Sequence, residues 1–172
     1  MKWIVIGLTA IVGIVALMLI AGMFVPKAHT ATVVANLAKS PDEVWAVIAD
    51  IPRVPEWFKE VSAAERLPDR DGHAVWKETY GGDFDATVVH TIEQKPLKLV
   101  REIQPGGAFH GSWTFDLMPT ADGTRLTVTE HGVVENLFFR GMMVFHDNTQ
   151  TARDYVAALS ERLGVNASTP ST

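Results

Sequence analysis

The sequence predicts an α+β domain in which an antiparallel sheet packs against a long C-terminal helix, preceded by a separate apolar helix. Three observations support this class. Strand-sized segments with alternating polar and apolar residues fill the middle of the chain, apolar residues recur at helical spacing over Asn136–Leu163, and Trp3–Pro26 contains no charged side chain. Alternation with period two is typical of half-buried strands, and spacings of three and four are typical of a helix.

The composition is that of a globular domain with a sizeable core. The chain has 172 residues, of which 47% are hydrophobic and 20% are charged. One domain is expected for this length. The net charge of −5 disfavours nucleic-acid binding, because proteins of that class carry a basic patch. The chain has no cysteine, which excludes disulfides, thiol catalysis and cysteine-ligated zinc.

The N-terminal run Trp3–Pro26 predicts a single membrane-spanning helix. At about 1.5 Å per residue it would extend roughly 36 Å, more than the roughly 30 Å of a bilayer core. A cleaved signal peptide is the alternative, but its apolar region is normally about 7–15 residues long, and the site Ala28-His29-Thr30 is a poor cleavage match. An uncleaved anchor through residues 3–25 is therefore favoured. The flanking lysines give little indication of orientation, and a globular domain on the extracytoplasmic side is the favoured arrangement.

The first strand and two short helices are predicted after a short linker. Thr30–Leu37 is rich in threonine and valine, as strands are. In Ser40-Pro41-Asp42-Glu43, serine is the N-cap, proline takes the first helical position and two acids follow in the first turn. That helix ends before Pro52, and a second one is expected over Val54–Lys59. Two short helices at this point would bridge the two ends of a sheet.

Six further strands follow at hairpin spacing, separated by turns rich in Gly, Pro and Asp. Their predicted ranges are Val61–Leu67, His73–Tyr80, Phe84–Gln94, Lys98–Gln104, Phe109–Met118 and Thr124–Val133. In the third of these, one face carries Phe84, Ala86, Val88, His90 and Ile92. This alternation predicts antiparallel strands with one buried face.

The helix predicted over Asn136–Leu163 has an apolar stripe that changes along its length. The stripe consists of Phe138, Met142, Phe145, Thr149, Ala152, Val156, Leu159 and Leu163. We expect Ala152–Leu163 to pack on the sheet and Phe138–His146 to roof a cavity, where methionines can repack around different ligands. The chain is thus divided into a membrane anchor with linker (1–29), a globular domain (30–164) and a flexible polar tail (165–172).

The order of these elements resembles a known superfamily, and three motifs strengthen the resemblance. Ser-Pro-Asp-Glu-Val-Trp opens the first helix at Ser40, Pro55-Glu56-Trp57 lies in the second, and Asp122-Gly123 precedes the strand Thr124–Glu130. Over roughly Thr30–Leu163 the chain is similar to the START-related polyketide cyclase/dehydrase and lipid-transport proteins, the SRPBCC superfamily. The resemblance implies a helix-grip fold, in which a seven-stranded antiparallel sheet wraps around the C-terminal helix and leaves an apolar cavity. It does not determine the function, because this superfamily includes carriers, cyclases, hydrolases and chaperone regulators.

Polar side chains interrupt the apolar rows of several predicted strands. Glu78 lies in a row with Trp76 and Tyr80, His90 with Val88 and Ile92, Arg101 with Leu99 and Ile103, and Glu130 with Leu126 and Val128. If these rows face the cavity, apolar walls would supply affinity and polar groups would orient a ligand. A buried Arg101 would pair with Glu78 or Glu130, because an isolated buried charge is costly. The alternative is a purely structural ion pair, or exposure of one member to solvent.

The candidate ligand-binding residues are Trp57, Trp76, Glu78, His90, Arg101, Trp113, Glu130, Met142 and His146. The tryptophans and His146 have an alternative role as packed core residues. No metal ligand and no cofactor is predicted, because the six histidines form no metal motif and the chain has no P-loop, Rossmann fingerprint or nucleophile elbow.

Three hypotheses on function follow. The favoured one is membrane-anchored binding or transport of a hydrophobic small molecule, lipid-like or polycyclic, without covalent chemistry. The second is a polyketide cyclase/dehydratase-like enzyme that uses His90, Glu130 or His146 as general acid/base. The third is an interaction module whose cavity is filled by its own side chains. The sequence leaves the ligand and the oligomeric state open.

Overall fold

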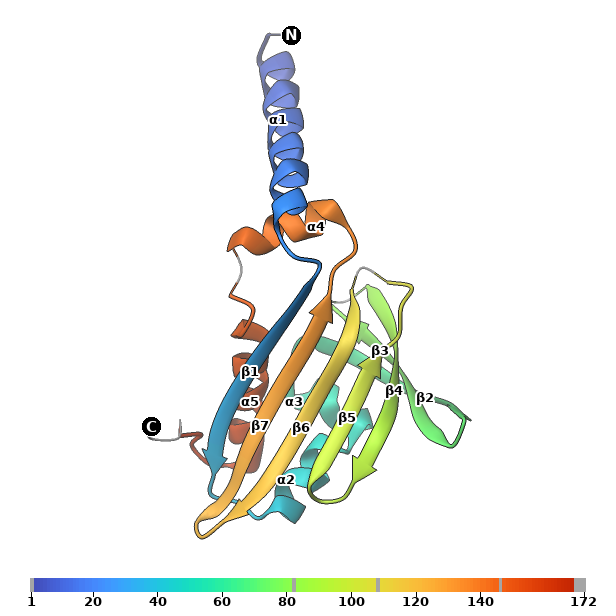
Figure 1. The fold of residues 1–172 in the computed structure, drawn as a ribbon, viewed down its shortest axis with the longest axis vertical. Helices are drawn as coiled ribbons and strands as arrows, with labels where there is room; N and C mark the ends of the chain where they lie inside the picture. Colours follow the sequence, from blue (N-terminus) through green and yellow to red (C-terminus); the bar gives the residue numbers. More distant parts are fainter. Residues whose placement is uncertain (1, 82, 108, 146, 169–172) are drawn as a thin grey trace.

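The computed structural model describes residues 2–81, 83–107, 109–145 and 147–168. The helices are α1 (Lys2–Phe24), α2 (Pro41–Ile48), α3 (Val54–Trp57), α4 (Leu137–Met142) and α5 (Gln150–Leu163), with 3-10 turns η1 (Ile51–Arg53) and η2 (Met143–Phe145). The strands are β1 (Ala28–Leu37), β2 (Val61–Arg70), β3 (His73–Tyr80), β4 (Phe84–Gln94), β5 (Lys98–Ile103), β6 (His110–Thr120) and β7 (Gly123–Val133). In Figure 1, α1 projects from one end of the domain that the other elements form.

All seven strands form one antiparallel sheet in the order β1-β7-β6-β5-β4-β3-β2. The predicted sheet is confirmed, and the predicted strand ranges agree with the observed ones to within a few residues. β1 and β2 lie at opposite edges, and α2, η1 and α3 connect them. Figure 1 shows these helices and α5 on the same face of the sheet. The helix-grip arrangement is therefore confirmed, with the main core between the sheet and the helices.

The start of α2 follows the predicted capping pattern. The Ser40 hydroxyl accepts a hydrogen bond from the Glu43 backbone N–H at 3.4 Å, and the Ser40 N–H donates to the Glu43 carboxylate at 2.9 Å. These reciprocal bonds satisfy N–H groups that a helix start leaves free. The Ser40 N–H is also the main reason that the pKa of Glu43 falls to about 2. From this start, α2 buries Val44, Trp45 and Ile48 in the core.

Tyr155 of α5 lies at the centre of an aromatic cluster that joins α5 to the sheet. Its side chain is almost completely buried. The ring centroids of Phe58, Trp57, Phe115 and Trp113 lie 5.0, 5.1, 5.2 and 5.7 Å from that of Tyr155. Aromatic pairs at such distances and tilted angles stabilise a core beyond the burial of their area. The cluster therefore fixes the position of α5 over β6.

A bulge in β4 changes the predicted face of this strand. Ala86, Val88 and His90 are buried as expected, but Ile92 is 37% exposed. The pairing of β4 with β5 shifts between His90 and Ile92, so one extra residue stands on the β4 side. Such an insertion interrupts the alternation of side chains. The buried row of β4 therefore ends at His90.

The C-terminal helix is divided, which corrects the single helix predicted over Asn136–Leu163. α4 ends at Met142, the turn η2 follows, and α5 begins at Gln150. The Asp147 carboxylate accepts hydrogen bonds from the Thr149 N–H at 2.9 Å and the Thr149 hydroxyl at 2.7 Å, and Arg153 donates to it at 2.7 Å. A carboxylate at this position favours a helix start.

The apolar stripe concealed this break because it continues across it. The residues Asp147-Asn148-Thr149 are of types typical of helix starts, and they indicated that a new helix begins at this point. The second half packs on the sheet as predicted, with Ala152, Val156 and Leu159 buried. The first half does not roof the cavity with Met142, which is 50% exposed; α4 packs against α1 instead.

α4 crosses the C-terminal end of α1 at very close range (Figure 1). Two glycines permit this approach. A Cβ atom on Gly22 would lie 1.9 Å from the Leu137 carbonyl oxygen, and one on Gly141 would lie 2.0 Å from the Met18 carbonyl oxygen. No side chain fits at such distances without separating the helices, and small residues are what close helix packing requires.

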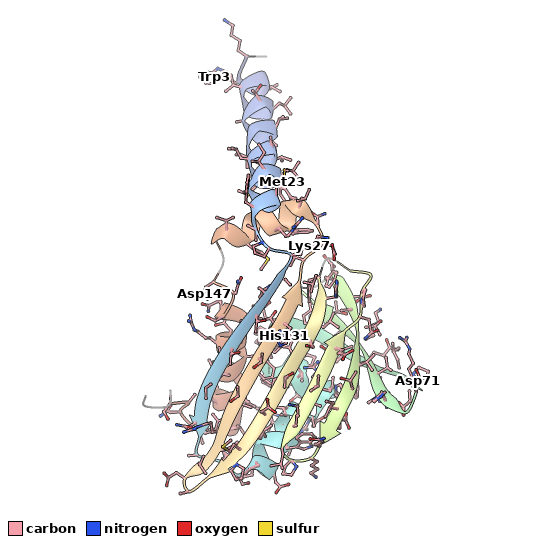
Figure 2. The ribbon with its side chains drawn as sticks, viewed as in Figure 1. Trp3, Met23, Lys27, Asp71, His131 and Asp147 are labelled. Carbon is pink, nitrogen blue, oxygen red and sulfur yellow. The ribbon has the colours of Figure 1, made fainter. Side chains whose placement is uncertain are left out.

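Polar contacts hold the same junction. Lys27 Nζ lies 2.8 Å from the Glu135 carboxylate, and the Val134 N–H donates to the Lys27 carbonyl at 2.9 Å. Arg140 is largely buried and donates a hydrogen bond of 3.4 Å to the Val25 carbonyl, directly after the end of α1. A cation at the C-terminal end of a helix interacts favourably with its last carbonyl groups. Figure 2 shows Lys27 between α1 and the sheet. By length and composition, α1 is a candidate membrane span.

The described part of the predicted flexible tail contacts the edge strand β1. The Asn36 N–H donates to the Ser168 carbonyl at 2.8 Å, and the Ser168 N–H donates back to the Asn36 carbonyl at 3.2 Å. Residues 169–172 lie outside the described residues. The division into anchor, domain and flexible tail stays a prediction.

We predict that Gly22→Leu separates α4 from α1, because the added side chain must enter the space that the Leu137 carbonyl occupies. Hydrogen exchange of the α4 amides in the full chain should become faster in this variant. Gly13→Leu is the matched control in the same helix, since nothing lies within 4 Å of a Cβ atom built there. Equal exchange rates in the two variants would contradict the close crossing.

Candidate functional site

A cavity of about 280 Å³ lies between the sheet and α5, at the end of the sheet nearest to α4. Its apolar lining consists of Phe58, Val61, Val88, Ile103, Phe109, Trp113, Val133, Val134 and Met143. Its polar lining consists of His29, Glu60, Tyr80, Arg101, Glu130, Asn148, Thr151 and Tyr155. A largely apolar cavity with a few polar groups is typical of a small-molecule site, and its volume is near the lower end of the usual range of about 300–1,000 Å³.

Arg101 and Glu78 form a buried ion pair at the wall of the cavity. Glu78 is fully buried and Arg101 is 7% exposed. Tyr80 Oη donates a hydrogen bond of 2.6 Å to the second oxygen of the same carboxylate. Burial opposes the charge on Arg101, but the Glu78 carboxylate together with Tyr80 and Tyr155 outweighs this effect, so the pKa of Arg101 is raised. Of the two partners expected for Arg101, the structure therefore has Glu78.

Two buried polar atoms in the cavity wall have no hydrogen-bond partner among the described residues. They are Arg101 Nε and Tyr155 Oη. Buried polar groups nearly always have a partner in folded proteins, whether protein, water or ligand. Burial raises the pKa of Tyr155 well above its usual value, so its phenol is a neutral O–H group near neutral pH. Both residues therefore keep an unused hydrogen-bonding group next to the cavity.

Glu130 of β7 adds a carboxyl group to the same cavity. Its side chain is 19% exposed and its Oε1 atom lies 3.8 Å from His29 Nε2. Burial raises the pKa of Glu130 to about 7. The carboxyl group is therefore partly protonated near neutral pH, and it can either donate or accept a hydrogen bond.

The structure brings together only some of the predicted site residues. Arg101, Trp113 and Glu130 line the cavity, and Glu78 supports it from behind Arg101. Trp57, Trp76, His90 and Met142 are not among its described lining residues. His146 lies outside the described residues.

Each residue placed away from the cavity has other surroundings. Trp57 packs on Tyr155 in the core, and the Arg66 guanidinium lies 5.2 Å from the Trp76 ring. His90 Nδ1 lies 2.5 Å from a Glu93 carboxylate oxygen. Burial, together with the Arg101 charge, lowers the pKa of His90.

Met142 is replaced in the cavity by its neighbour Met143. Met142, the last residue of α4, is half exposed, whereas Met143, the first residue of η2, lines the cavity. Met143 lies in the segment Phe138–His146 that was expected to roof the cavity.

Sequence reasoning missed several lining residues. Tyr80 was visible in the row of Glu78, and Thr151 and Tyr155 have the spacing of one helical turn. His29 was assigned to a linker, because β1 begins at Ala28 rather than Thr30. Among the residues that the structure describes, no group of three or more His, Asp or Glu side chains could hold a metal ion.

The raised pKa of Glu130 predicts a pH-dependent stability. Below pH 4.5, the ordinary pKa of a glutamate, the protonated Glu130 makes its full contribution to the free energy of unfolding. This contribution is lost as the pH rises through about 7, because the folded protein must then bury a charged carboxylate. Glu130→Gln should therefore stabilise the protein relative to wild type increasingly between pH 4.5 and 8. The gain is up to about 3 kcal/mol, since a tenfold change in an equilibrium constant corresponds to about 1.4 kcal/mol.

The measurement is the free energy of unfolding of the full chain in detergent at several pH values. Glu161→Gln is the control, because Glu161 is exposed on α5. A pH-independent difference between Glu130→Gln and wild type would show that Glu130 is ionised like an exposed acid.

Three solved structures have a similar fold. The Zhui aromatase/cyclase from a Streptomyces species has a TM-score of 0.65 and 15% identity, over 80% of this chain and 93% of that one. The di-domain aromatase/cyclase StfQ of the steffimycin pathway has a TM-score of 0.64 and 12% identity, over 80% of this chain and 53% of that one. A START superfamily protein from Mycobacterium smegmatis has a TM-score of 0.60 and 15% identity, over 80% of this chain and 97% of that one. At these identities the likeness concerns the fold alone.

The sequence itself indicates the family. None of the curated proteins matches the chain. The sequence profile of the family described as polyketide cyclase/dehydrase and lipid transport matches residues 37–156, from the end of β1 into α5. This match covers strands β2 to β7, the short helices α2 and α3 and most of the residues that line the cavity. The chain therefore belongs to the polyketide cyclase/dehydrase and lipid transport family, within the SRPBCC superfamily.

Proposed function

We propose that the protein binds a hydrophobic small molecule that carries a neutral oxygen group, while α1 anchors it in a membrane. The observation that carries this proposal is the cavity with a mainly apolar wall and two unpartnered polar atoms, Arg101 Nε and Tyr155 Oη. The apolar wall supplies affinity, and the two atoms orient the ligand. An alcohol, ketone, ester or phenol oxygen matches both groups.

The charges around the cavity favour a neutral ligand over an anion. Among its described lining residues, Arg101 is the one Lys or Arg, and its charge is balanced by Glu78. Glu60 and Glu130 add acidic groups to the lining. An anionic ligand would lose its hydration without gaining an unpaired cation, which is unfavourable in a partly buried site.

The size of the cavity limits how much of a ligand it encloses. A volume of about 280 Å³ accommodates a small ring system or one end of a longer molecule. A polycyclic compound or a full acyl chain would extend through the opening. The ligand class is therefore a compact hydrophobic molecule, or a lipid of which one part enters the cavity.

Several contacts support α1 as a permanent anchor rather than a cleaved signal. The Gly22–Gly141 crossing, the Arg140 contact with Val25 and the packing of α4 against α1 would all be lost on cleavage. Removal of α1 would also expose Gly141 and the side of α4 that packs against α1. An anchored domain on the extracytoplasmic side is the arrangement we propose.

The test of ligand binding is Thr151→Trp, which places a large side chain in the cavity lining. We expect this variant of the full chain, in lipid nanodiscs, to lose most of its binding of the neutral apolar dye Nile red. Ala157→Trp is the control, because Ala157 is exposed on the same helix. Native mass spectrometry of wild type should in addition detect a co-purified neutral hydrophobic compound. Equal dye binding by both variants, with no such compound, would refute the proposal.

A cyclase- or dehydratase-like enzyme is the second candidate, and one observation favours it. Glu130 lines the cavity and has a pKa of about 7, the range suited to a general acid/base near neutral pH. The aromatase/cyclase names of two similar structures give the class of reaction to try. For an enzyme, Glu130→Gln should reduce turnover of an aromatic polyketide-type substrate by roughly 10²-fold or more while dye binding persists. Unchanged turnover would exclude this role for Glu130.

A further inference from the structure

We propose that α4 and η2 form a second membrane contact in the surface layer of the bilayer that α1 spans. This contact would place the η2 side of the cavity next to lipid. This inference rests on the proposed anchor function of α1. It adds an interaction surface with a stated partner, the interfacial region of a lipid bilayer.

The first observation is a group of exposed apolar side chains on α4 and η2. Leu137, Phe139, Met142 and Val144 are 38, 45, 50 and 53% exposed. Outside α1, the other exposed large hydrophobic side chains among the described residues are Ile92, Leu97 and Met118, which lie on the sheet or its turns. An exposed apolar group of this kind on a short segment indicates a contact with another apolar surface.

The second observation is the depth of α4 relative to α1. α4 contacts the backbone of α1 at Met18 and Gly22, whereas α1 continues to Phe24 and the run without charged side chains to Pro26. At about 1.5 Å per residue, these contacts lie about 3–9 Å inside the end of α1. Amphipathic helices at membrane surfaces bury their apolar face about 5–10 Å deep. If α1 spans a membrane, α4 therefore lies at the depth of such a helix.

The third observation is the placement of charges. Within α4 and η2 the one charged side chain is Arg140, which is largely buried and directed at the Val25 carbonyl. Charged groups flank the segment, with Glu135 paired to Lys27 before it and Asp147 paired to Arg153 after it. In Figure 2, Met23 lies on the α1 side of α4, and Lys27 and Asp147 lie on the sheet side. This arrangement keeps charges at the level of the polar headgroups.

The fourth observation connects this segment to the cavity. Met143 of η2 and Asn148 line the cavity, while the adjacent Met142 and Val144 are exposed. Met143 therefore reaches the cavity from a segment whose neighbouring side chains are exposed at the surface. A molecule dissolved in the bilayer would reach the cavity past η2 without crossing water. The partner argued here is lipid, and a second copy of the chain on the same side chains is the alternative.

The experiment uses the absence of cysteine from the chain. Full-length single-cysteine variants Phe139→Cys and Val144→Cys are labelled with a small fluorophore and reconstituted in phosphatidylcholine–phosphatidylglycerol vesicles. Met118→Cys reports an exposed apolar position on β6, and Ile11→Cys reports the middle of α1. Each label is quenched either by nitroxide groups on the lipid acyl chains or by aqueous iodide.

We expect the labels at 139 and 144 to be quenched severalfold more strongly by lipid nitroxide than the label at 118, which iodide should quench most. If iodide quenches 139 and 144 while nitroxide quenches 11, the anchor stands and the interfacial contact is refuted. If iodide also quenches 11, the anchor and this inference both fail, whereas cavity binding is decided separately by the dye assay. Protection of 139 and 144 that disappears on dilution with lipid would assign the surface to a second copy and refute the inference.

Discussion

The packing of α5 on the sheet is the interaction on which the other features depend. Tyr155 contacts aromatic rings from α3, from its C-cap position and from β6, so one residue holds three parts of the domain together. The same side chain also forms part of the cavity wall and carries an unpartnered hydroxyl group. Tyr155 therefore contributes both to the packing of the core and to the geometry of the site. A change that weakens the core at Tyr155 also changes the site.

The buried polar groups show how the site is built into this core. Glu78 lies on β3 and Arg101 on β5, and the attraction between their charges offsets the free-energy cost of burying each of them. Tyr80 donates a hydrogen bond to the second oxygen of the Glu78 carboxylate, but Arg101 Nε has no partner among the described residues. In proteins, replacing a buried ion pair by well-packed apolar residues is often neutral or stabilising. The proposed ligand binding gives these polar groups a role beyond folding.

The predictable parts of the molecule are those in which local pattern and tertiary contact agree. The strands, the capped start of α2 and the burial of Ala152, Val156 and Leu159 follow from alternation, capping and helical spacing. The side chains of α4 were also recognised as apolar, but periodicity cannot tell whether an apolar face meets a core, another helix or lipid. For the same reason the pattern continued across the break at Asp147, and it could not tell that Met143 lines the cavity while Met142 does not. Arg101 and Glu130 were found because a polar residue interrupts an apolar row, and Trp113 because a large aromatic side chain on a buried face can line a cavity. His29 required the exact start of β1.

The connection between α1 and β1 has a consequence for how a ligand would be passed on. Only Val25, Pro26 and Lys27 separate the two elements, and Lys27 is itself bonded to Glu135 and Val134. A domain held this way by a membrane-spanning α1 stays at one height above the bilayer and diffuses in two dimensions. It cannot cross an aqueous compartment to deliver cargo. Whatever receives the ligand must lie in the same membrane or come to it, so the rate of exchange would depend on surface density rather than on bulk concentration.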